Sequence, residues 1–206
     1  MRPLPRLHAV TDAAVRALPD LGVRAAAIAS AGSAVALHAR DRSATAAELA
    51  ALADRFVSHT LPAEAATIVN GRADVARAVG AQGVQLGADD LEPRDVHAAF
   101  GGLWVGRSVH SLPEARAAVA EGADYLLLGH VYPTPSHPGR APLGLDVVRA
   151  VSELGVPVVA IGGVTVPHAR ELRAAGAYGL AAIRALWLAD DPARAALAFL
   201  EEWIDD

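Results

Sequence analysis

Polar residues that could bind ligands or move protons follow each of the short apolar runs in this sequence. Arginine, histidine, asparagine and glycine dominate these positions, whereas paired carboxylates are scarce. The residues are Thr11, Asp12, His38, Arg40, Arg42, Asn70, Arg72, Gly87, Asp89, Asp90, Ser108, His110, His130, Thr134, Gly162, Gly163 and Arg184. Such a set favours anion binding and proton transfer. It argues against a glycoside hydrolase, which needs two carboxylates across one bond.

Two glycines after the seventh of the eight apolar runs, at 157–161, indicate a phosphate site. Gly162 and Gly163 expose backbone N–H groups and let an anion approach closely. With Ile183 and Arg184, which follow the last run, they form the phosphate position that is usual in α/β barrels. The other interpretation is a tight turn that needs glycine for its backbone alone.

Two arginines indicate a second anionic group on the ligand. Arg40 and Arg72 follow the second and third apolar runs. The planar guanidinium pairs with a carboxylate or phosphate through two parallel hydrogen bonds. The competing interpretation is that both are ordinary surface arginines.

His130 is the candidate acid/base group. It follows the sixth run directly, after Gly129, and we expect its ring to point into the mouth of the barrel. An imidazole can take a proton from one atom and give it to another near neutral pH. The alternative is a histidine that caps a strand end. His38 and His110 are weaker candidates, and His8 is expected to be structural. No histidine spacing typical of a metal site occurs, so no metal is expected.

The composition excludes several kinds of chemistry. All 18 Lys+Arg residues are arginine, so neither a Schiff-base lysine nor a phosphate-loop lysine is present. The absence of cysteine excludes disulfides and thiolate nucleophiles. A formal net charge of -5 argues against nucleic acid or a membrane surface as a partner. No apolar run is long enough to span a membrane and the start lacks a secretory signal pattern, so we expect a cytoplasmic location.

The elements that must position these residues alternate between strands and helices. Strands are predicted at 7–11, 34–39, 66–70, 83–86, 103–106, 125–129, 157–161 and 179–183, with helices between them, for example at 45–57, 112–121, 145–154 and 167–175. Pro19 and Gly22 predict a broken helix within 13–32. Eight such units predict an α/β fold, a compact (β/α)8 TIM barrel that forms one domain over 1–206. An open doubly wound sheet is the alternative.

The ordered motifs resemble the thiamine phosphate synthase/TenI superfamily, and more closely its TenI branch, the thiazole tautomerases. They are Leu7-His-Ala-Val-Thr-Asp12, His38-Ala-Arg-Asp-Arg-Ser43, Val69-Asn-Gly-Arg-Ala-Asp74, Val84-Gln-Leu86, Gly106-Arg-Ser-Val-His-Ser111, Ala123-Asp-Tyr-Leu-Leu-Leu-Gly-His-Val131 and Ala160-Ile-Gly-Gly163. The resemblance implies an isomerase that converts a carboxythiazolylidene ethyl phosphate to its aromatic tautomer. It implies no cofactor.

The same resemblance implies roles for individual residues. His130 would be the acid/base, Gly162, Gly163, Ile183 and Arg184 would hold the phosphate, and Arg40 and Arg72 would pair with the carboxylate. Asn70, Ser108, His110 and Thr134 would complete the binding site of this small phosphorylated thiazole. The sequence leaves open whether the chain forms a homo-oligomer.

Departures from the synthase pattern favour the TenI branch. Gly71 stands where synthases carry a magnesium-binding aspartate, and Arg42 stands where they carry a lysine. Arg184 replaces a serine, and His137 falls in a segment that ends in lysine in synthases. Asp90 and the Pro133-Thr134 pair keep the synthase pattern. A thiamine phosphate synthase with altered metal binding, and a non-catalytic binding protein, therefore remain as alternatives.

Overall fold

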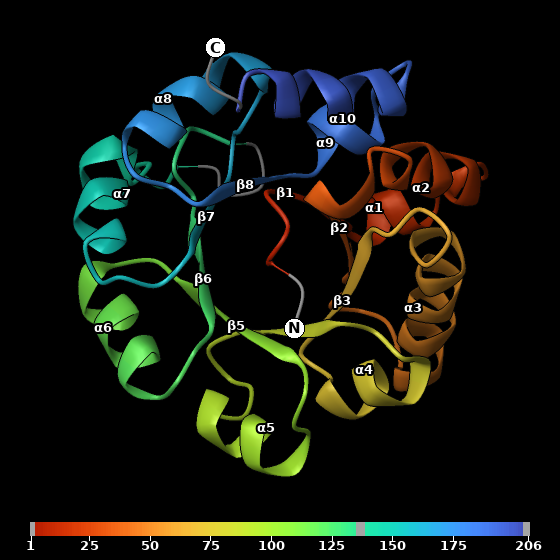
Figure 1. Ribbon diagram of the computed structural model, residues 1–206, viewed down its shortest axis with the longest axis horizontal. Helices are drawn as coiled ribbons and strands as arrows, with labels where there is room; N and C mark the ends of the chain where they lie inside the picture. Colours follow the sequence, from red (N-terminus) through yellow and green to blue (C-terminus); the bar gives the residue numbers. More distant parts are fainter. Residues whose placement is uncertain (1–2, 135–138, 204–206) are drawn as a thin grey trace.

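Eight parallel strands close into a barrel in the computed structural model, which describes residues 3–134 and 139–203. The strands are β1 (Leu7–Val10), β2 (Val35–Ala39), β3 (Ala66–Asn70), β4 (Gly83–Leu86), β5 (Trp104–Val109), β6 (Tyr125–Gly129), β7 (Val158–Ile161) and β8 (Gly179–Ala182). Figure 1 looks into the ring that they form. Because β1 pairs with β8, the sheet has no open edge, which confirms the predicted (β/α)8 barrel and excludes the open sheet.

Helices surround the barrel in the order of the chain (Figure 1). They are α1 (Ala13–Arg16), α2 (Leu21–Ala29), α3 (Ala46–Thr60), α4 (Ala73–Val79), α5 (Pro93–Ala99), α6 (Leu112–Ala120), α7 (Gly144–Ser152), α8 (Ala169–Ala174), α9 (Arg184–Trp187) and α10 (Pro192–Glu201), with 3-10 turns η1 (Gly32–Ala34) and η2 (Val166–His168). The predicted break in the first helical segment is confirmed, because α1 and α2 are separate. The segment predicted as one helix over 167–175 begins as the η2 turn instead.

Side-chain caps fix where two of these helices begin. The Thr45 side chain accepts from the Glu48 N–H, and Glu48 Oε2 accepts from the Thr45 N–H at 2.8 Å, which completes a capping box at the start of α3. Ser111 caps α6 in the same way through the Glu114 N–H. These caps fix the residue at which each helix begins. The loop between the preceding strand and the helix therefore has a defined length, which helps to position the residues at the end of that strand.

Alternation along the strands separates two apolar layers. Val69 and its outward neighbours pack under the helices, whereas Ile68, Trp104, Tyr125 and Leu127 belong to a separate cluster inside the barrel. Successive side chains of a strand point to opposite faces. Continuing the inward phase to the ends of several strands, and just past some of them, brings a second set of residues to the mouth of the barrel. This set comprises Arg40, Asn70, Ser108, His110 and Ile183.

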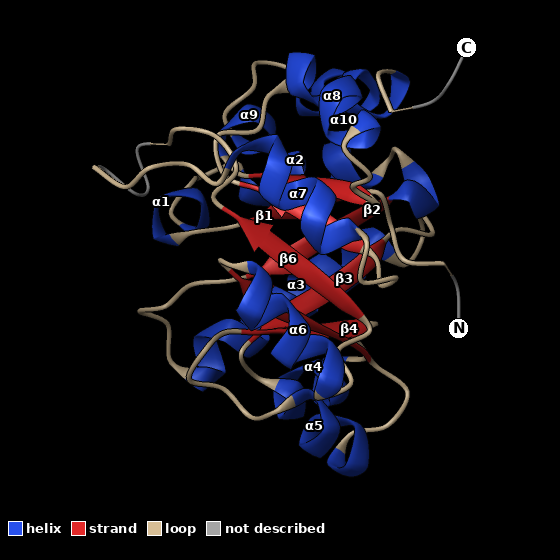
Figure 2. Cartoon of the chain, turned by 90° about the vertical axis from the view of Figure 1, so that its left-hand side faces the viewer, coloured by secondary structure: helices blue, strands red, loops and turns tan. Residues whose placement is uncertain are grey.

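The two ends of the barrel differ. In Figure 1 the N-terminal segment lies across the centre of the ring, and Leu4 packs against the interior cluster. The arrowhead of β6 in Figure 2 points away from that segment, toward the loops that follow the strands. One end is thus covered by the chain itself, and the end that carries the candidate ligand-binding residues is lined by loops. Within the described residues, no helix has the length and apolarity to cross a membrane.

Candidate active site

Arg40 is a half-buried cation at the carboxyl end of β2. Its backbone N–H donates to Thr11 Oγ1 at 2.9 Å, and its Nη1 lies 3.5 Å from the Thr11 carbonyl oxygen. Burial, followed by the nearby charge of Arg42, lowers the pKa of Arg40. A guanidinium stays protonated despite such a shift. No acidic side chain in the described part of the chain forms an ion pair with Arg40, so its charge is available to an anion.

Three further arginines at the same end lack an acidic partner among the residues that the structure describes. Arg42 follows β2, Arg140 lies in the loop between β6 and α7, and Arg184 begins α9 after β8. All three are exposed. Together with Arg40 they give the mouth a positive charge although the whole chain is acidic, which favours ligands that carry several negative charges.

Arg72 differs from these four because it is already paired. Its Nε donates to Asp74 Oδ1 at 2.8 Å, and its Nη2 donates to the other carboxylate oxygen. This bidentate pair raises the pKa of Arg72 and lowers that of Asp74. The sequence prediction that Arg72 binds a ligand carboxylate therefore requires this ion pair to open first.

Asp90 is a carboxylate that approaches the end of β3 at Gly71. Its Oδ2 accepts from the Gly87 N–H at 2.6 Å, and a Cβ built on Gly71 would lie 3.3 Å from Oδ1. An aspartate at position 71 would therefore stand beside Asp90, whereas glycine leaves a single carboxylate. The described residues contain no group of three or more histidine, cysteine, aspartate or glutamate side chains suited to a metal ion. Magnesium prefers several hard oxygen ligands. This donor set does not fit the magnesium site of the synthase pattern.

Asn70 ends a row of buried polar side chains that runs up through the barrel. His8 Nε2 lies 3.0 Å from the Pro5 carbonyl oxygen, and His8 Nδ1 lies 2.8 Å from His38 Nε2. His38 Nδ1 then lies 3.1 Å from Oδ1 of the Asn70 side-chain amide. His8 and His38 are both fully buried, so this row connects the covered end of the barrel with Asn70 at the mouth.

Ser108 and His110 line the β5 side of the mouth. Gln85 Nε2 donates to Ser108 Oγ at 3.0 Å, while Gln85 Oε1 is buried without a partner among the described residues. His110 Nδ1 donates to the Gly129 carbonyl oxygen, and its ring is otherwise exposed. The structure therefore brings both predicted residues to the mouth, with Gln85 beneath Ser108.

His130 lies under the loop between β6 and α7, and its side chain is almost fully buried. Its Nε2 donates to the Arg140 carbonyl oxygen at 3.3 Å. A Cβ on Gly162 would lie 2.3 Å from the Cβ of His130. His130 thus lies against the backbone at Arg140 and Gly162, and its role as the acid/base stays a prediction. Thr134 is the last described residue before the gap, and His137 lies outside the described residues.

Gly162 and Gly163 are required by the backbone itself. Their φ angles are 99° and 68°, which residues with a Cβ rarely adopt. A Cβ on Gly163 would lie 2.4 Å from the Pro133 carbonyl oxygen. The tight-turn interpretation of these glycines therefore holds. Their role in phosphate binding, with Ile183 and Arg184, remains a prediction.

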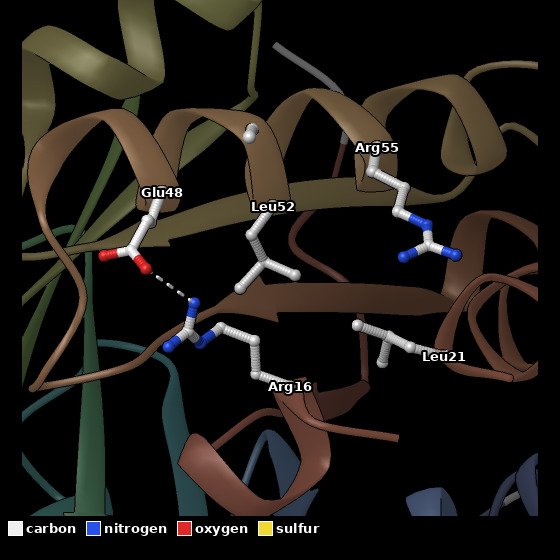
Figure 3. Close-up of a pocket in the computed structure, with 6 residues that line it drawn as sticks. Arg16, Leu21, Glu48, Leu52 and Arg55 are labelled. Carbon is white, nitrogen blue, oxygen red and sulfur yellow. Dashed lines mark hydrogen bonds and ion pairs between the residues drawn. The ribbon is translucent and has the colours of Figure 1, made fainter. Parts of the chain in front are cut away.

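A cleft on the flank of the barrel is lined by none of the predicted site residues. Figure 3 shows Arg16, Leu21, Glu48, Leu52 and Arg55 around it, with Arg16 linked to Glu48. The Nη1 of Arg16 lies 3.3 Å from Glu48 Oε1, and its Nε pairs with Asp41. These ion pairs tie α1 to the loop after β2. They hold the segment that carries Arg40 and Arg42, which is a structural role.

Sequence reasoning expected His8 to be structural, in agreement with its full burial, but it missed the partners of His8 and the role of Gln85. Both residues sit inside strands that otherwise read as apolar runs, so their polar character was the available signal. The partnership of His8 with His38 joins two strands, and no local pattern predicts which inward residues meet. The pairing of Asp41 with Arg16 is similarly nonlocal.

Comparisons with known proteins identify the relatives of this chain. The family model described as thiamine monophosphate synthase matches residues 7–186. A "Thiamine-phosphate synthase" from Salinispora arenicola is 43% identical over 205 residues, 98% of each chain. A protein of the same name from Gloeobacter violaceus is 43% identical over 79% of this chain, and the match spans about half, 48%, of that longer relative. The solved structure of a thiamine phosphate pyrophosphorylase from Pyrococcus furiosus superimposes with a TM-score of 0.83 at 33% identity, covering 96% of this chain and 95% of the other.

These relatives show that the tautomerase prediction, and with it the isomerase class, was wrong. The relatives carry the name of a synthase, which is a transferase, and the similarity extends over the whole chain. The prediction gave too much weight to a few substituted positions after the strands, where loops vary without altering the barrel. Two of its supports are also weaker in the structure, because Arg72 is paired with Asp74 and His130 lies under the backbone of Arg140.

Proposed function

Since the chain belongs to the thiamine monophosphate synthase family, we propose that it is a thiamine-phosphate synthase, which joins a pyrimidine pyrophosphate to a thiazole phosphate. The observation that carries this proposal is the 43% identity with a relative of that name across 98% of both chains. Both substrates are anionic and small enough for the mouth of a barrel.

The reaction replaces one bond to carbon with another. The thiazole ring nitrogen attacks the methylene carbon of the pyrimidine while the bond from that carbon to the pyrophosphate oxygen breaks. The pyrophosphate leaves with the electron pair and gains negative charge, and the thiazole becomes a cation. Groups that stabilise charge on the leaving pyrophosphate therefore accelerate the reaction most.

Arginines supply that stabilisation in our proposal. Arg40 and Arg42 follow one strand, and Arg40 is half-buried without an acidic partner among the described residues. A buried guanidinium interacts with a phosphate more strongly than an exposed one, because water screens it less. Asp90 offers one carboxylate where the synthase pattern has two, so no step is assigned to a metal.

The second substrate needs its own anion site. We assign the phosphate of the thiazole to Gly162, Gly163, Ile183 and Arg184, the position usual for phosphates in barrels. Asn70, Ser108, His110 and Thr134 are assigned to the space between the two anion sites. In this arrangement the two anion sites follow β2 and β7–β8, which only β1 separates in the ring, so both substrates are held close enough to bring the reacting nitrogen against the carbon.

A direct assay tests the proposal. The purified chain is incubated with pyrimidine pyrophosphate and thiazole phosphate, with magnesium in one reaction and EDTA in the other. The products are separated, identified and quantified by mass spectrometry. We expect thiamine phosphate and free pyrophosphate in equal amounts over many turnovers. Binding of both substrates without turnover in either arm would contradict the proposal and would indicate a non-catalytic binding protein.

A further inference from the structure

The row of hydrogen bonds from Pro5 to Asn70 can run in one direction only. At its lower end the Pro5 carbonyl oxygen is an acceptor, so the contact at 3.0 Å needs a hydrogen on His8 Nε2. The contact of His8 with His38 at 2.8 Å joins ring nitrogens that can each donate or accept, whereas the Asn70 atom 3.1 Å from His38 Nδ1 is Oδ1 in the structure, which only accepts. The carbonyl therefore determines the rest of the row.

The Pro5 carbonyl oxygen fixes the position of the hydrogen on each histidine ring in turn, up to Asn70 at the mouth. A neutral His8 with its hydrogen on Nε2 has a bare Nδ1, which accepts from His38 Nε2–H. A neutral His38 with its hydrogen on Nε2 then has a bare Nδ1, which needs a donor. Asn70 offers that donor in its amide nitrogen, because a half turn of the amide exchanges its nitrogen and oxygen.

The two other arrangements are less stable. In the reverse direction, the lone pairs of His8 Nε2 and the Pro5 oxygen would face each other at 3.0 Å. A doubly protonated ring would place an imidazolium inside the barrel, where both histidines are fully buried. Burial lowers the pKa of His8 to about 4. Burial, then the neighbouring His8, lowers the pKa of His38, and the charge of Arg40 acts in the same direction.

We propose that His8 and His38 are both neutral with hydrogen on Nε2, and that Asn70 gives its amide nitrogen to His38 and presents its carbonyl oxygen to the mouth. The aromatic neighbour of His8 is consistent with a neutral ring. The centroid of the Tyr125 ring lies 5.8 Å from that of His8, and the tyrosine carries no charge. His38 and His8 are thus positioning residues, and Asn70 is an acceptor that selects a substrate group with an N–H or O–H to donate.

The first test needs no substrate. Long-range proton–nitrogen correlation spectra of the nitrogen-15-labelled chain near pH 7.5 distinguish the two neutral tautomers of each histidine from the imidazolium. We expect two slowly exchanging Nε2–H rings, with signals assigned through His8→Gln and His38→Gln. A hydrogen on Nδ1 of either ring, or a charged ring, would overturn the proposal. Because the ligand-free chain is measured, this result is independent of whether the chain is a synthase.

Replacing the donor at position 70 tests the direction of the hydrogen bonds in the row from Pro5 to Asn70. Asn70→Asp removes the amide hydrogens and leaves a group that accepts only. The hydrogen of His38 should then move to Nδ1, or His38 should become charged, and the spectrum reports either change. An unchanged Nε2–H pattern in this variant would mean that Asn70 does not set the tautomer, and the proposal would fail.

Two variants of His38 test the link to substrate binding, which rests on the proposed function. Glutamine offers a donor and an acceptor at similar positions, so His38→Gln should keep KM for both substrates within about threefold. His38→Leu has neither group and should raise KM of at least one substrate about tenfold, the scale of one lost hydrogen bond. Similar KM values in all three proteins would show that Asn70 binds no substrate, even where the tautomers are as proposed.

Discussion

The carboxylate of Asp90 lies against the backbone of Gly71, so that a Cβ at position 71 would come 3.3 Å from Asp90 Oδ1. The φ angle of Gly71 is 74°, in the left-handed region that aspartate and asparagine tolerate better than most residues. Position 71 is therefore the place where one substitution could pair a second carboxylate with Asp90.

Gly71→Asp should create a binding site for a divalent cation. Two adjacent carboxylates supply hard oxygen ligands and negative charge, which magnesium and manganese prefer. We expect the variant to bind manganese at least about tenfold more tightly than the parent chain, as an added charged ligand contributes more than about 1.4 kcal/mol. Calorimetric titration measures this difference. Gly71→Asn is the matched control, with the same shape but no charge. Equal affinity in all three proteins would show that Asp90 is not positioned as the geometry indicates.

Arg40→Gln should weaken the binding of pyrimidine pyrophosphate by about tenfold to a hundredfold, the scale of a lost hydrogen bond to a charged group. Glutamine keeps a donor of similar reach and removes the charge. Arg77→Gln is the control, because Arg77 is an exposed arginine on α4. Affinities come from calorimetry or from competition with inorganic pyrophosphate. An equal loss in both variants would point to the net charge of the chain rather than to Arg40.

The sequence predicts the barrel well because its strands are continuously apolar runs. The predicted bounds of β3, β4 and β6 agree with the structure. β5 was predicted to end at Gly106, yet it continues to Val109, with Arg107 opposite Leu126 and Ser108 opposite Leu127. Backbone hydrogen bonds extend a strand whatever its side chains are, so polar residues at a strand end hide its true length.

The site is less predictable because side-chain partners are not local in sequence. Position at the end of an apolar run brings Arg40 and Asn70 to the mouth. The same reasoning assigned a ligand to Arg72, whose actual partner is Asp74, two positions along the chain. Whether an arginine is free or paired decides its function, and residue type alone does not tell the two apart. The wrong prediction of the tautomerase branch of the superfamily had the same origin, because it relied on the types of a few exposed residues.

Gly162→Ala should destabilise the chain more than Gly122→Ala. Both glycines have positive φ angles, 99° and 85°, so both variants incur backbone strain of about 1 kcal/mol or more. A Cβ at position 162 would also lie 2.3 Å from His130 Cβ, whereas nothing lies within 4 Å at position 122. The added clash should cost about 1–3 kcal/mol further. Urea unfolding measures both, and equal losses would mean that the loop carrying His130 moves aside without cost.

The buried histidine pair should make the chain less stable as the pH falls below neutrality. The pKa of His8 is lowered to about 4 in the folded chain, whereas an unfolded histidine has its usual value near 6.5. Between these values the unfolded chain binds a proton that folded His8 does not. Its contribution is therefore complete above pH 6.5 and is lost progressively as the pH falls toward 4.

Urea unfolding at pH 7.5 and pH 5 measures this effect. For His8 alone we expect the free energy of unfolding to fall by about 2 kcal/mol between these two values, and His38 acts in the same direction. His8→Gln cannot titrate and can keep hydrogen bonds to Pro5 and His38, so its stability should fall by less. Ion-paired carboxylates such as Asp41 and Asp74 lose their contribution only at lower pH, because their unfolded pKa lies near 4. A parent chain and a His8→Gln variant with the same pH dependence would show that folded His8 takes up a proton between pH 7.5 and pH 5 as readily as the unfolded chain does, contrary to its lowered pKa.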